Sequence, residues 1–286
     1  MNKKIKLIEC PRDAMQGWKQ FIPSEKKIEY LNSLIQIGFH TIDFGSFVSE
    51  KAIPQMADTK KIIPHLQLDN SISKLLAIVA NIRGATEAVE FDEITYLGFP
   101  FSVSEIFQKR NTNSTIEESL KTIEAIQSIC HVKSKELVIY ISMGFGNPYG
   151  EKFNNEIVFK WVNKLHQLGI KTISIADTVG IATAAQVNEM MSSLISEFSK
   201  IEIGVHLHST PLNWEEKFEA AYRAGCLRFD GALKGFGGCP MAGNDLVGNM
   251  NTEFMISYLE KNNIPLQFNQ DALNQSIQLA SEIFAN

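Results

Sequence analysis

The chain lacks an apolar run that approaches the roughly 20 residues a helix needs to cross a bilayer. It also lacks an excess of basic residues, because 32 aspartates and glutamates outnumber 27 lysines and arginines and the net charge is −5. A nucleic-acid-binding surface carries a clear basic excess. We therefore expect neither a membrane nor a nucleic acid among the partners of this protein.

Cysteine is scarce, and the four cysteines form no CxxC pair, which argues against a zinc finger. The amino-terminal segment MNKKIKLIEC has neither the apolar core of a secretory signal nor the arginine- and serine-rich character of a transit peptide. We expect a cytoplasmic protein with reduced thiols. Cys10, Cys130 and Cys226 are interpreted as small buried apolar residues.

Short β-rich apolar runs alternate with longer amphipathic segments along all 286 residues. This alternation predicts parallel strands joined by helical crossovers, and eight strands suit a single (β/α)8 TIM barrel of the α/β class. An open doubly wound sheet is the alternative, but no GxGxxG follows the first strand to favour it. The strands are predicted at 5–10, 41–46, 65–69, 93–99, 136–142, 172–177, 201–208 and 227–233.

Amphipathic segments fill the intervals between these strands. Ser24 begins one predicted helix, which Gly38 ends, and Ser114 begins another, with Glu117 completing a capping box. No linker or repeat interrupts the chain, so we predict one domain over residues 1–286 with extra carboxy-terminal helices. The remaining helices are predicted at 154–168, 184–198, 213–224, 251–262 and 270–284.

Two histidines end one predicted strand in the segment VHLHST (205–210). Residues two apart in a strand face the same side, so His206 and His208 would point together, as a pair of metal ligands does. A strand end with two solvated or core-bonded histidines explains the pair equally well when it is taken alone. Polar residues that follow the first and last strands favour the metal interpretation, and these are Arg12, Asp13, Cys239 and Asn249.

Active residues of a TIM barrel collect where the carboxyl ends of its strands meet. Asp13 and Asn249 would add oxygen donors to the two imidazoles there, and mixed oxygen and nitrogen ligands suit Mg²⁺ or Mn²⁺. Arg12 could neutralise an enolate oxygen. Cys239, in the glycine-rich segment GFGGCPMAGND, could act as an acid or base. Each residue also has a structural interpretation: Asp13 as a helix cap or partner of Arg12, Asn249 as a turn residue and Cys239 as a buried apolar group.

Several segments resemble, in matching order, the 3-hydroxy-3-methylglutaryl-CoA lyases, a family of TIM-barrel metallolyases. The resemblance implies a divalent-metal-dependent carbon–carbon lyase that forms acetyl-CoA and acetoacetate from an acyl-CoA small-molecule substrate. It also implies a homodimer. The matching segments are Pro11-Arg12-Asp13 with Gln16, FVSEKAIPQMAD (47–58), FQKRNTNSTIEES (107–119), ADTVG (176–180), VHLHST (205–210), GGCP (237–240) and GNMNTE (248–253).

The resemblance also implies roles for individual residues. Arg12 would stabilise the enolate, Cys239 would transfer a proton, and Asp13 or His206 would be the base. The implied metal ligands are Asp13, His206, His208 and Asn249. The implied substrate-binding residues are Gln16, Asp43, Phe47, Val48, Ser49, Lys51, Asn111 and Asp177.

The chain departs from the family at several positions near these residues. Ala14 replaces a glycine, Asn147 replaces a cysteine, and the loop between Cys239 and Asn249 is one residue longer. After His208 the family has Asp-Thr-Tyr-Gly, whereas this chain has Ser-Thr-Pro-Leu. These departures leave two alternatives open. One is a related metal-dependent aldolase, acyl-CoA lyase or synthase acting on another hydroxy or 2-oxo acid, and the other is a non-catalytic metal-binding barrel.

Overall fold

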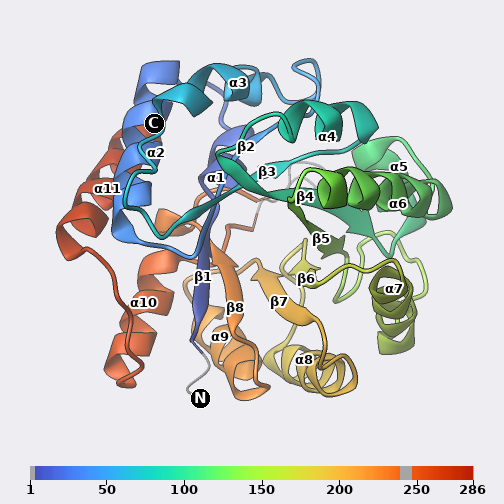
Figure 1. The fold of residues 1–286 in the computed structure, drawn as a ribbon. Coiled ribbons are helices and arrows are strands. Elements are labelled where there is room, and N and C mark those ends of the chain that lie inside the picture. Colours follow the sequence, from blue (N-terminus) through green and yellow to red (C-terminus); the bar gives the residue numbers. More distant parts are fainter. Residues whose placement is uncertain (1–3, 239–246, 286) are drawn as a thin grey trace.

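A computed structural model describes residues 4–238 and 247–285 and shows eight parallel strands closed into a barrel in sequence order (Figure 1). The predicted TIM barrel is therefore confirmed. The strands are β1 (Lys6–Glu9), β2 (Thr41–Ser46), β3 (Lys74–Ile78), β4 (Ile94–Ser102), β5 (Glu136–Ser142), β6 (Thr172–Asp177), β7 (Glu202–Leu207) and β8 (Arg228–Gly231).

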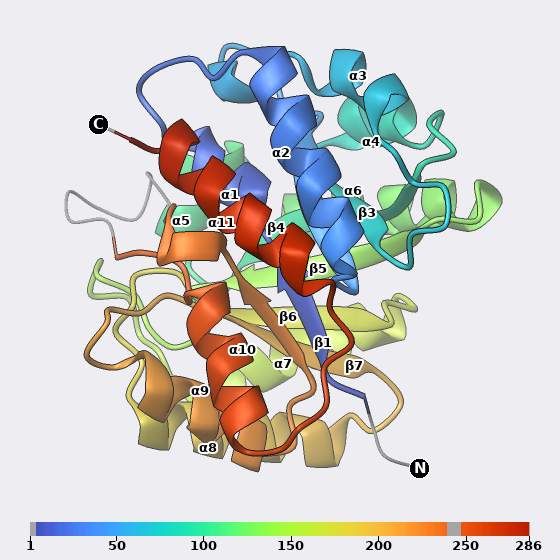
Figure 2. The same ribbon diagram turned by 90° about the vertical axis from the view of Figure 1, so that its left-hand side faces the viewer.

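Helices surround the barrel, and the extra carboxy-terminal pair is present as predicted (Figure 1). The last helix, α11, lies along α2 on the outside of the barrel (Figure 2), where Oγ of Ser276 donates to Oγ of Ser33. The helices are α1 (Pro11–Gln16), α2 (Ser24–Ile37), α3 (Thr59–Ile62), α4 (Ile82–Ala88), α5 (Glu105–Thr112), α6 (Ile116–Val132), α7 (Asn155–Gln167), α8 (Ala184–Glu197), α9 (Trp214–Arg223), α10 (Thr252–Lys261) and α11 (Gln270–Ile283), with 3-10 turns η1 (Pro54–Met56), η2 (Ile63–His65) and η3 (Leu233–Gly235).

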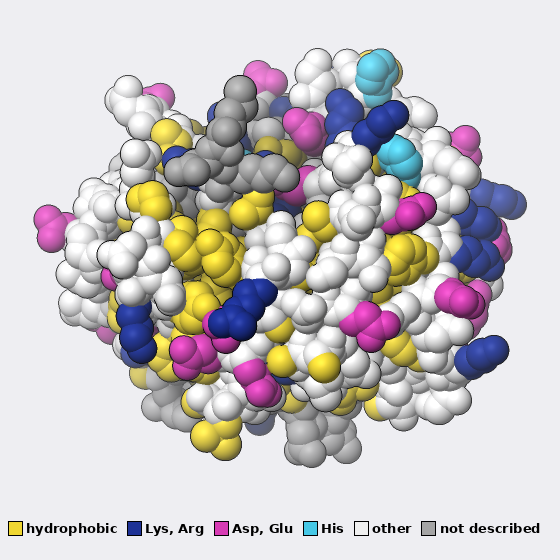
Figure 3. All heavy atoms as spheres, turned by 90° about the horizontal axis from the view of Figure 1, so that it is seen from below, with side chains coloured by type: hydrophobic (Ala, Val, Ile, Leu, Met, Phe, Trp, Pro, Cys, Tyr) yellow, Lys and Arg dark blue, Asp and Glu magenta, His cyan; other side chains and the backbone are white. Residues whose placement is uncertain are grey.

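One face of the molecule carries both charged and apolar side chains (Figure 3). Basic and acidic groups are scattered among apolar ones over the face drawn in Figure 3. Within the described ranges, no helix is both long and apolar enough to cross a membrane.

The strand predicted at 65–69 is wrong, because the third strand is β3 at Lys74–Ile78. The segment from His65 to Asp69 leaves η2 as a loop, and its leucines pack against the core while its polar residues stay exposed. This loop alternates apolar and polar residues in the same way as a half-buried strand. The true strand is a continuous apolar run, as expected for a parallel strand covered on both faces.

The capping box of α6 lies one residue later than predicted. The backbone N–H of Glu118 donates to Oγ1 of Thr115, and the N–H of Thr115 donates to Oε2 of Glu118. Ser114 instead shares hydrogen bonds with the hydroxyls of Thr112 and Ser119. The motif contains adjacent Ser-Thr and Glu-Glu pairs, so both registers satisfy the sequence rule.

The barrel interior is apolar on one side and polar on the other. Leu76 and Ile78 of β3 pack with Val138 and Tyr140 of β5 in a small cluster of their own. The strands β6 to β8 contribute polar groups instead, among them the fully buried Arg228. Gly204 makes room for that arginine, since a Cβ at this position would lie 2.8 Å from Cδ of Arg228.

A buried glutamate ties the carboxy-terminal segment to the barrel. Oε1 of Glu9, at the end of β1, accepts from the N–H of Leu233 at 2.7 Å, and Oε2 accepts from Oγ1 of Thr252 at 2.6 Å. Burial is the largest influence on this carboxyl and raises its pKa to about 8. Glu9 therefore favours the neutral form in the folded protein.

The Glu9→Gln variant should lose part of the pH dependence of stability. A folded-state pKa above the unfolded value means that the stabilisation is present below about pH 4.5 and is lost as pH rises through about 8. The full effect is at most about 5 kcal/mol, at about 1.4 kcal/mol per pKa unit. Urea unfolding between pH 5.5 and 9 should show a flatter profile for Glu9→Gln than for wild type. Glu90→Gln, at an exposed carboxylate, is the control, and equal profiles for Glu9→Gln and wild type would contradict the assignment.

Candidate active site

A cavity of about 210 Å³ opens at the carboxyl ends of the strands. Its wall is apolar on the side of β3 and β4, where Ile78, Ala80 and Pro100 lie. Its polar end is formed by Arg12, Asp13, Gln16, Thr178, His206 and His208, and Asn111 of α5 adds a polar group elsewhere in the lining. Polar groups converging at one end of an apolar cleft are typical of a small-molecule site.

Three side chains at this polar end form a candidate metal centre. Asp13 lies in α1 directly after β1, and His206 and His208 lie at the end of β7. The ligand atoms of these three residues lie within 4.8 Å of one another. One carboxylate and two imidazoles could hold a divalent cation and leave coordination positions open.

The protonation of two of these groups suits metal binding. Burial raises the pKa of Asp13, but opposing influences, of which the charge of Arg12 is the largest and the hydrogen bond from Asn249 is another, lower it more, to about 2. Burial, with His206 as a neighbour, lowers the pKa of His208 to about 4. Asp13 is therefore ionised and His208 neutral near pH 7, which are the forms that bind metals.

Asn249 supplies a fourth candidate ligand. An isolated bridge places it beside His208, and its Nδ2 donates to Oδ2 of Asp13 at 2.7 Å and to the carbonyl of Phe236 at 2.9 Å. The other end of the amide, Oδ1, is buried with no hydrogen-bond partner among the described residues. A buried acceptor without a donor, next to Asp13, fits the oxygen-rich coordination of a hard cation.

Arg12 is held rigidly at the edge of the candidate centre. Its Nη1 donates to Oδ1 of Asp13 at 3.1 Å and to Oε1 of Gln16 at 2.9 Å. Its Nε and Nη2 donate to Asp43 on β2. Burial raises the pKa of Asp43 even though Arg12 opposes the shift. Asp43 therefore acts on the site by holding the guanidinium.

The other residues selected from the sequence are divided between the cavity and its surroundings. Gln16, Val48 and Asn111 line the cavity, as do Arg12, Asp13 and both histidines. Phe47 packs in the core against Phe91, and Ser49 and Lys51 are exposed. Cys239 lies outside the described residues, so its position relative to the cavity is not part of the structure.

Sequence comparison places this geometry in a known family. The chain matches the HMGL-like family model over residues 4–279. It belongs to the HMGL-like family. It is 32% identical to a zebrafish protein named 3-hydroxy-3-methylglutaryl-CoA lyase, cytoplasmic, over 89% of this chain and 76% of the relative. It is 30% identical to the rat hydroxymethylglutaryl-CoA lyase, mitochondrial, over 90% and 78% of the two chains.

Solved structures of HMG-CoA lyases have the same fold as this HMGL-like chain. The enzyme from Acinetobacter baumannii, solved in complex with coenzyme A and 3-methylmalate, has a TM-score of 0.90 and 31% identity, over 98% of this chain and 91% of that one. The enzyme from Pseudomonas aeruginosa has a TM-score of 0.90 and 28% identity, over 99% and 94%.

A buried lysine that sequence analysis missed lies behind this HMGL-like site. Nζ of Lys217 in α9 donates to Oδ2 of Asp177 at 2.8 Å and to the carbonyls of Gly180 and His208 at 3.0 Å. Asp177, selected as a substrate-binding residue, is thus paired with Lys217 and is not among the residues lining the cavity. The available signal was a lysine four residues before the buried Ala221, on the apolar face of its helix.

Replacing Lys217 by Met should destabilise the protein strongly. Both side chains of the pair are 1% exposed, so the variant would leave Asp177 buried without its cation. We expect a loss of about 3–5 kcal/mol in the free energy of unfolding, measured by urea titration. Lys164→Met, at an exposed pair with Glu117, is the matched control and should cost far less. A loss below about 1 kcal/mol for Lys217→Met would contradict a structural role for the pair.

Proposed function

We propose that this protein is a divalent-metal-dependent carbon–carbon lyase that cleaves 3-hydroxy-3-methylglutaryl-CoA into acetyl-CoA and acetoacetate. The convergence of Asp13, His206 and His208 beside Arg12, in a chain of the HMGL-like family, carries the proposal. The zebrafish and rat relatives bear the name of this activity, and coenzyme A in the Acinetobacter structure supports an acyl-CoA substrate.

The proposed cation is Mg²⁺ or Mn²⁺. Asp13, His206 and His208 would be its ligands, and the unpaired Oδ1 of Asn249 would be the fourth. This donor set has two oxygens and two imidazole nitrogens and contains no thiolate among the described residues, which suits Mg²⁺ or Mn²⁺. Such a cation, when bound, would lower the pKa of the substrate hydroxyl and polarise it.

The residues around the cation site would divide the reaction among them. Asp13 would accept the proton of the tertiary hydroxyl, because the two ring nitrogens of His206 would be used by the cation and by Asp230. The carbon–carbon bond would break as the hydroxyl carbon becomes a ketone. The electron pair of that bond would remain on the acetyl-CoA fragment as an enolate. Arg12 would stabilise the enolate oxygen, and the Cys239 thiol would supply a proton to the enolate carbon.

Four N–H groups of Arg12 are committed to protein acceptors in the described part of the chain. A guanidinium has five, so one N–H on Nη2 would be left for the substrate. Asp43 would keep that hydrogen aimed by holding Nε and Nη2. This arrangement would place a fixed positive charge where the enolate forms, without reorganisation during the reaction.

The acyl-CoA would be bound along one side of the barrel mouth. Gln16, Val48 and Asn111 line the cavity and would contact the acyl part. Phe47, Ser49 and Lys51 would belong to the same binding segment. The exposed Lys51 would face solvent and the coenzyme A part of the substrate. Asp177 would act indirectly, through Lys217.

We further propose that the protein is a single-domain, cytoplasmic homodimer. An elution mass twice that of the 32.0 kDa chain would support the dimer.

Metal-stripped protein should release acetoacetate from 3-hydroxy-3-methylglutaryl-CoA only after Mg²⁺ or Mn²⁺ is added back. Cys239→Ser should reduce kcat by about 10²–10⁴, because the proton donor is lost. Cys130→Ser, at a buried thiol in α6, is the matched control and should retain activity. Metal binding without acetoacetate release would move the assignment to another substrate.

Arg12→Lys should separate catalysis from metal binding. Lysine keeps the charge but cannot hold Asp43 and Gln16 while facing the substrate. We expect kcat to fall by about 10²–10³ while the dissociation constant for Mn²⁺ changes by no more than a few-fold. Arg83→Lys, at an exposed arginine in α4, is the control. An unchanged kcat in Arg12→Lys would remove Arg12 from the mechanism.

A related aldolase or synthase acting on another hydroxy or 2-oxo acid is the second candidate. The segment after His208 favours this second candidate. Ser209 stands where the resembled family has an aspartate, and it is buried with its hydroxyl against Sδ of Met250. Assaying the same metal-loaded protein with 2-oxo acid aldols would distinguish the two activities.

A further inference from the structure

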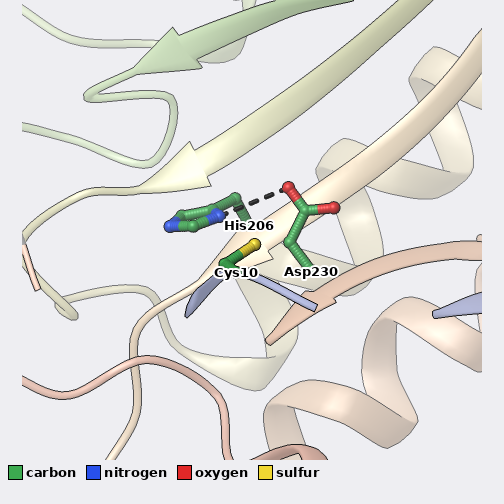
Figure 4. A group of neighbouring side chains, drawn as sticks. All are labelled: Cys10, His206 and Asp230. Atoms are coloured by element: carbon green, nitrogen blue, oxygen red, sulfur yellow. Dashed lines mark hydrogen bonds and ion pairs between the residues drawn. The ribbon is translucent and has the colours of Figure 1, made fainter. Parts of the chain in front are cut away.

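His206 is held from behind by a buried carboxylate. Its Nδ1 lies 3.3 Å from Oδ2 of Asp230 on β8, and the other ring nitrogen points away from Asp230 (Figure 4). The register of β7 and β8 pairs these two residues directly. The side chain of Asp230 is fully buried, and Oγ of Ser174 donates to the same oxygen at 3.3 Å.

This contact would decide which nitrogen of His206 is free. A carboxylate accepts a hydrogen bond, so the contact places the ring hydrogen on Nδ1. The lone pair of a neutral imidazole is then on Nε2, at the end of the ring away from Asp230. Carboxylates that fix the tautomer of a ligating histidine commonly strengthen metal binding by 10–100-fold.

Buried polar atoms near Asp230 include Oδ1 of Asp230 itself and Nε and Nη2 of Arg228, which have no partner of good hydrogen-bond geometry among the described residues. The hydroxyl of Tyr140 lies close enough to Arg228 to interact with it. Arg228 and Asp230 are two residues apart on β8 and therefore face the same side. Burial lowers the pKa of Arg228, but Asp230 and Tyr140 lie near enough to raise it overall.

These atoms can all be satisfied by water. A buried polar group without a partner is destabilising, so several together indicate a bound molecule between them. Water can accept from Arg228 or Tyr140 and donate to Asp230, whereas an anion would be repelled by the carboxylate. A buried water commonly makes about three such hydrogen bonds.

We propose that Asp230 is a positioning residue for the metal site, holding His206 through Nδ1, and that a buried water shared with Arg228 and Tyr140 holds Asp230 in turn. The inference rests on the proposed metal centre, but its geometric part concerns His206 alone. The hydrogen-bonded chain would run from Arg228 through the water and Asp230 to His206, inside the polar half of the barrel. Asp230 would touch neither substrate nor cation.

The tautomer of His206 tests the positioning directly. In metal-free protein with ¹⁵N-labelled histidine, at a pH high enough for the ring to be neutral, the nitrogens of His206 should report hydrogen on Nδ1 alone. Asp230→Ala should give a mixture of tautomers, and Asp230→Asn should also weaken the preference, because an amide can present either its oxygen or its NH₂ group to Nδ1. A single Nδ1–H tautomer in Asp230→Ala would overturn the proposal.

Metal affinity tests the consequence. Titration with Mn²⁺ should give a dissociation constant about 10–100-fold higher for Asp230→Ala than for wild type, with a smaller increase for Asp230→Asn. Cys10→Ala is the matched control, because Cys10 is grouped with the same histidine and aspartate but makes only a weak contact to the carbonyl of Ile8 (Figure 4). An equal loss in Cys10→Ala and Asp230→Ala would indicate that the trio binds the metal itself, and would overturn the proposal.

Two further outcomes separate this inference from the proposed function. If wild-type protein bound no Mn²⁺, the metal centre would be wrong, and the tautomer measurement alone would decide whether Asp230 orients His206. A high-resolution crystal structure should show a water within hydrogen-bonding distance of Oδ1 of Asp230 and of Arg228 or Tyr140. A direct contact between Arg228 and Asp230 with no water would overturn the proposed role of the water.

Discussion

The pairing of β1 with β8 closes the barrel, and the candidate site exists only because of that closure. The register places Lys6, Ile8 and Glu9 opposite Arg228, Asp230 and Gly231. The segments that follow these strands are then neighbours, which allows Nδ2 of Asn249 to donate to Asp13 across 236 residues of sequence. If a sheet of the same strand order were left open between β1 and β8, these strands would lie at opposite edges, and the carboxylate would be separated from the histidines.

Closure also creates an interior in which polar groups must find partners inside the protein. The interiors of such barrels are ordinarily filled by branched apolar side chains, and β3 and β5 of this protein follow that rule. On the opposite side, Ser174, His206, Arg228 and Asp230 replace apolar packing with hydrogen bonds. This substitution is costly for stability, because buried polar groups gain little and lose much when a partner is removed. Such a cost is typical of a site selected for chemistry.

The sequence was sufficient for features that depend on local pattern. The alternation of apolar runs and amphipathic segments predicted the barrel, and the spacing of His206 and His208 predicted that they face one side. The strand at 74–78 was missed because the loop at 65–69 has the alternating pattern expected of a strand. The strand itself is a continuous apolar run without that alternation. Local pattern therefore fails where a buried strand and an exposed extended segment compete.

Features that depend on register or on long-range contacts were beyond the sequence. Asp230 lies in the ordinary strand segment LRFDGAL, and nothing there shows that β7 will set it opposite His206, 24 residues earlier. Lys217 is likewise one lysine among several in a charged helix, and only the fold carries its ammonium to Asp177 and the carbonyl of His208. The partners of Asp230 and Lys217 are set by how strands and helices pack in the folded barrel. A short sequence motif carries no information about that packing.

The charges gathered at the polar end do not cancel, and their imbalance bears on the cation. With both histidines neutral, as in the metal-binding form, Asp13, Asp43 and Asp230 against Arg12 and Arg228 leave one formal negative charge in a region with little solvent. Arg12 is already shared between Asp13 and Asp43, and the guanidinium of Arg228 makes its one ion pair with Glu202 at 3.6 Å among the described residues. Asp13, both histidines and the unpaired oxygen of Asn249 converge in the same region. A divalent cation there would reverse the local sign to positive, and an anionic enolate would then restore balance. The unbalanced negative charge of the metal-free site would therefore favour binding of the cation. The positive charge of the metal-bound site would then stabilise the enolate.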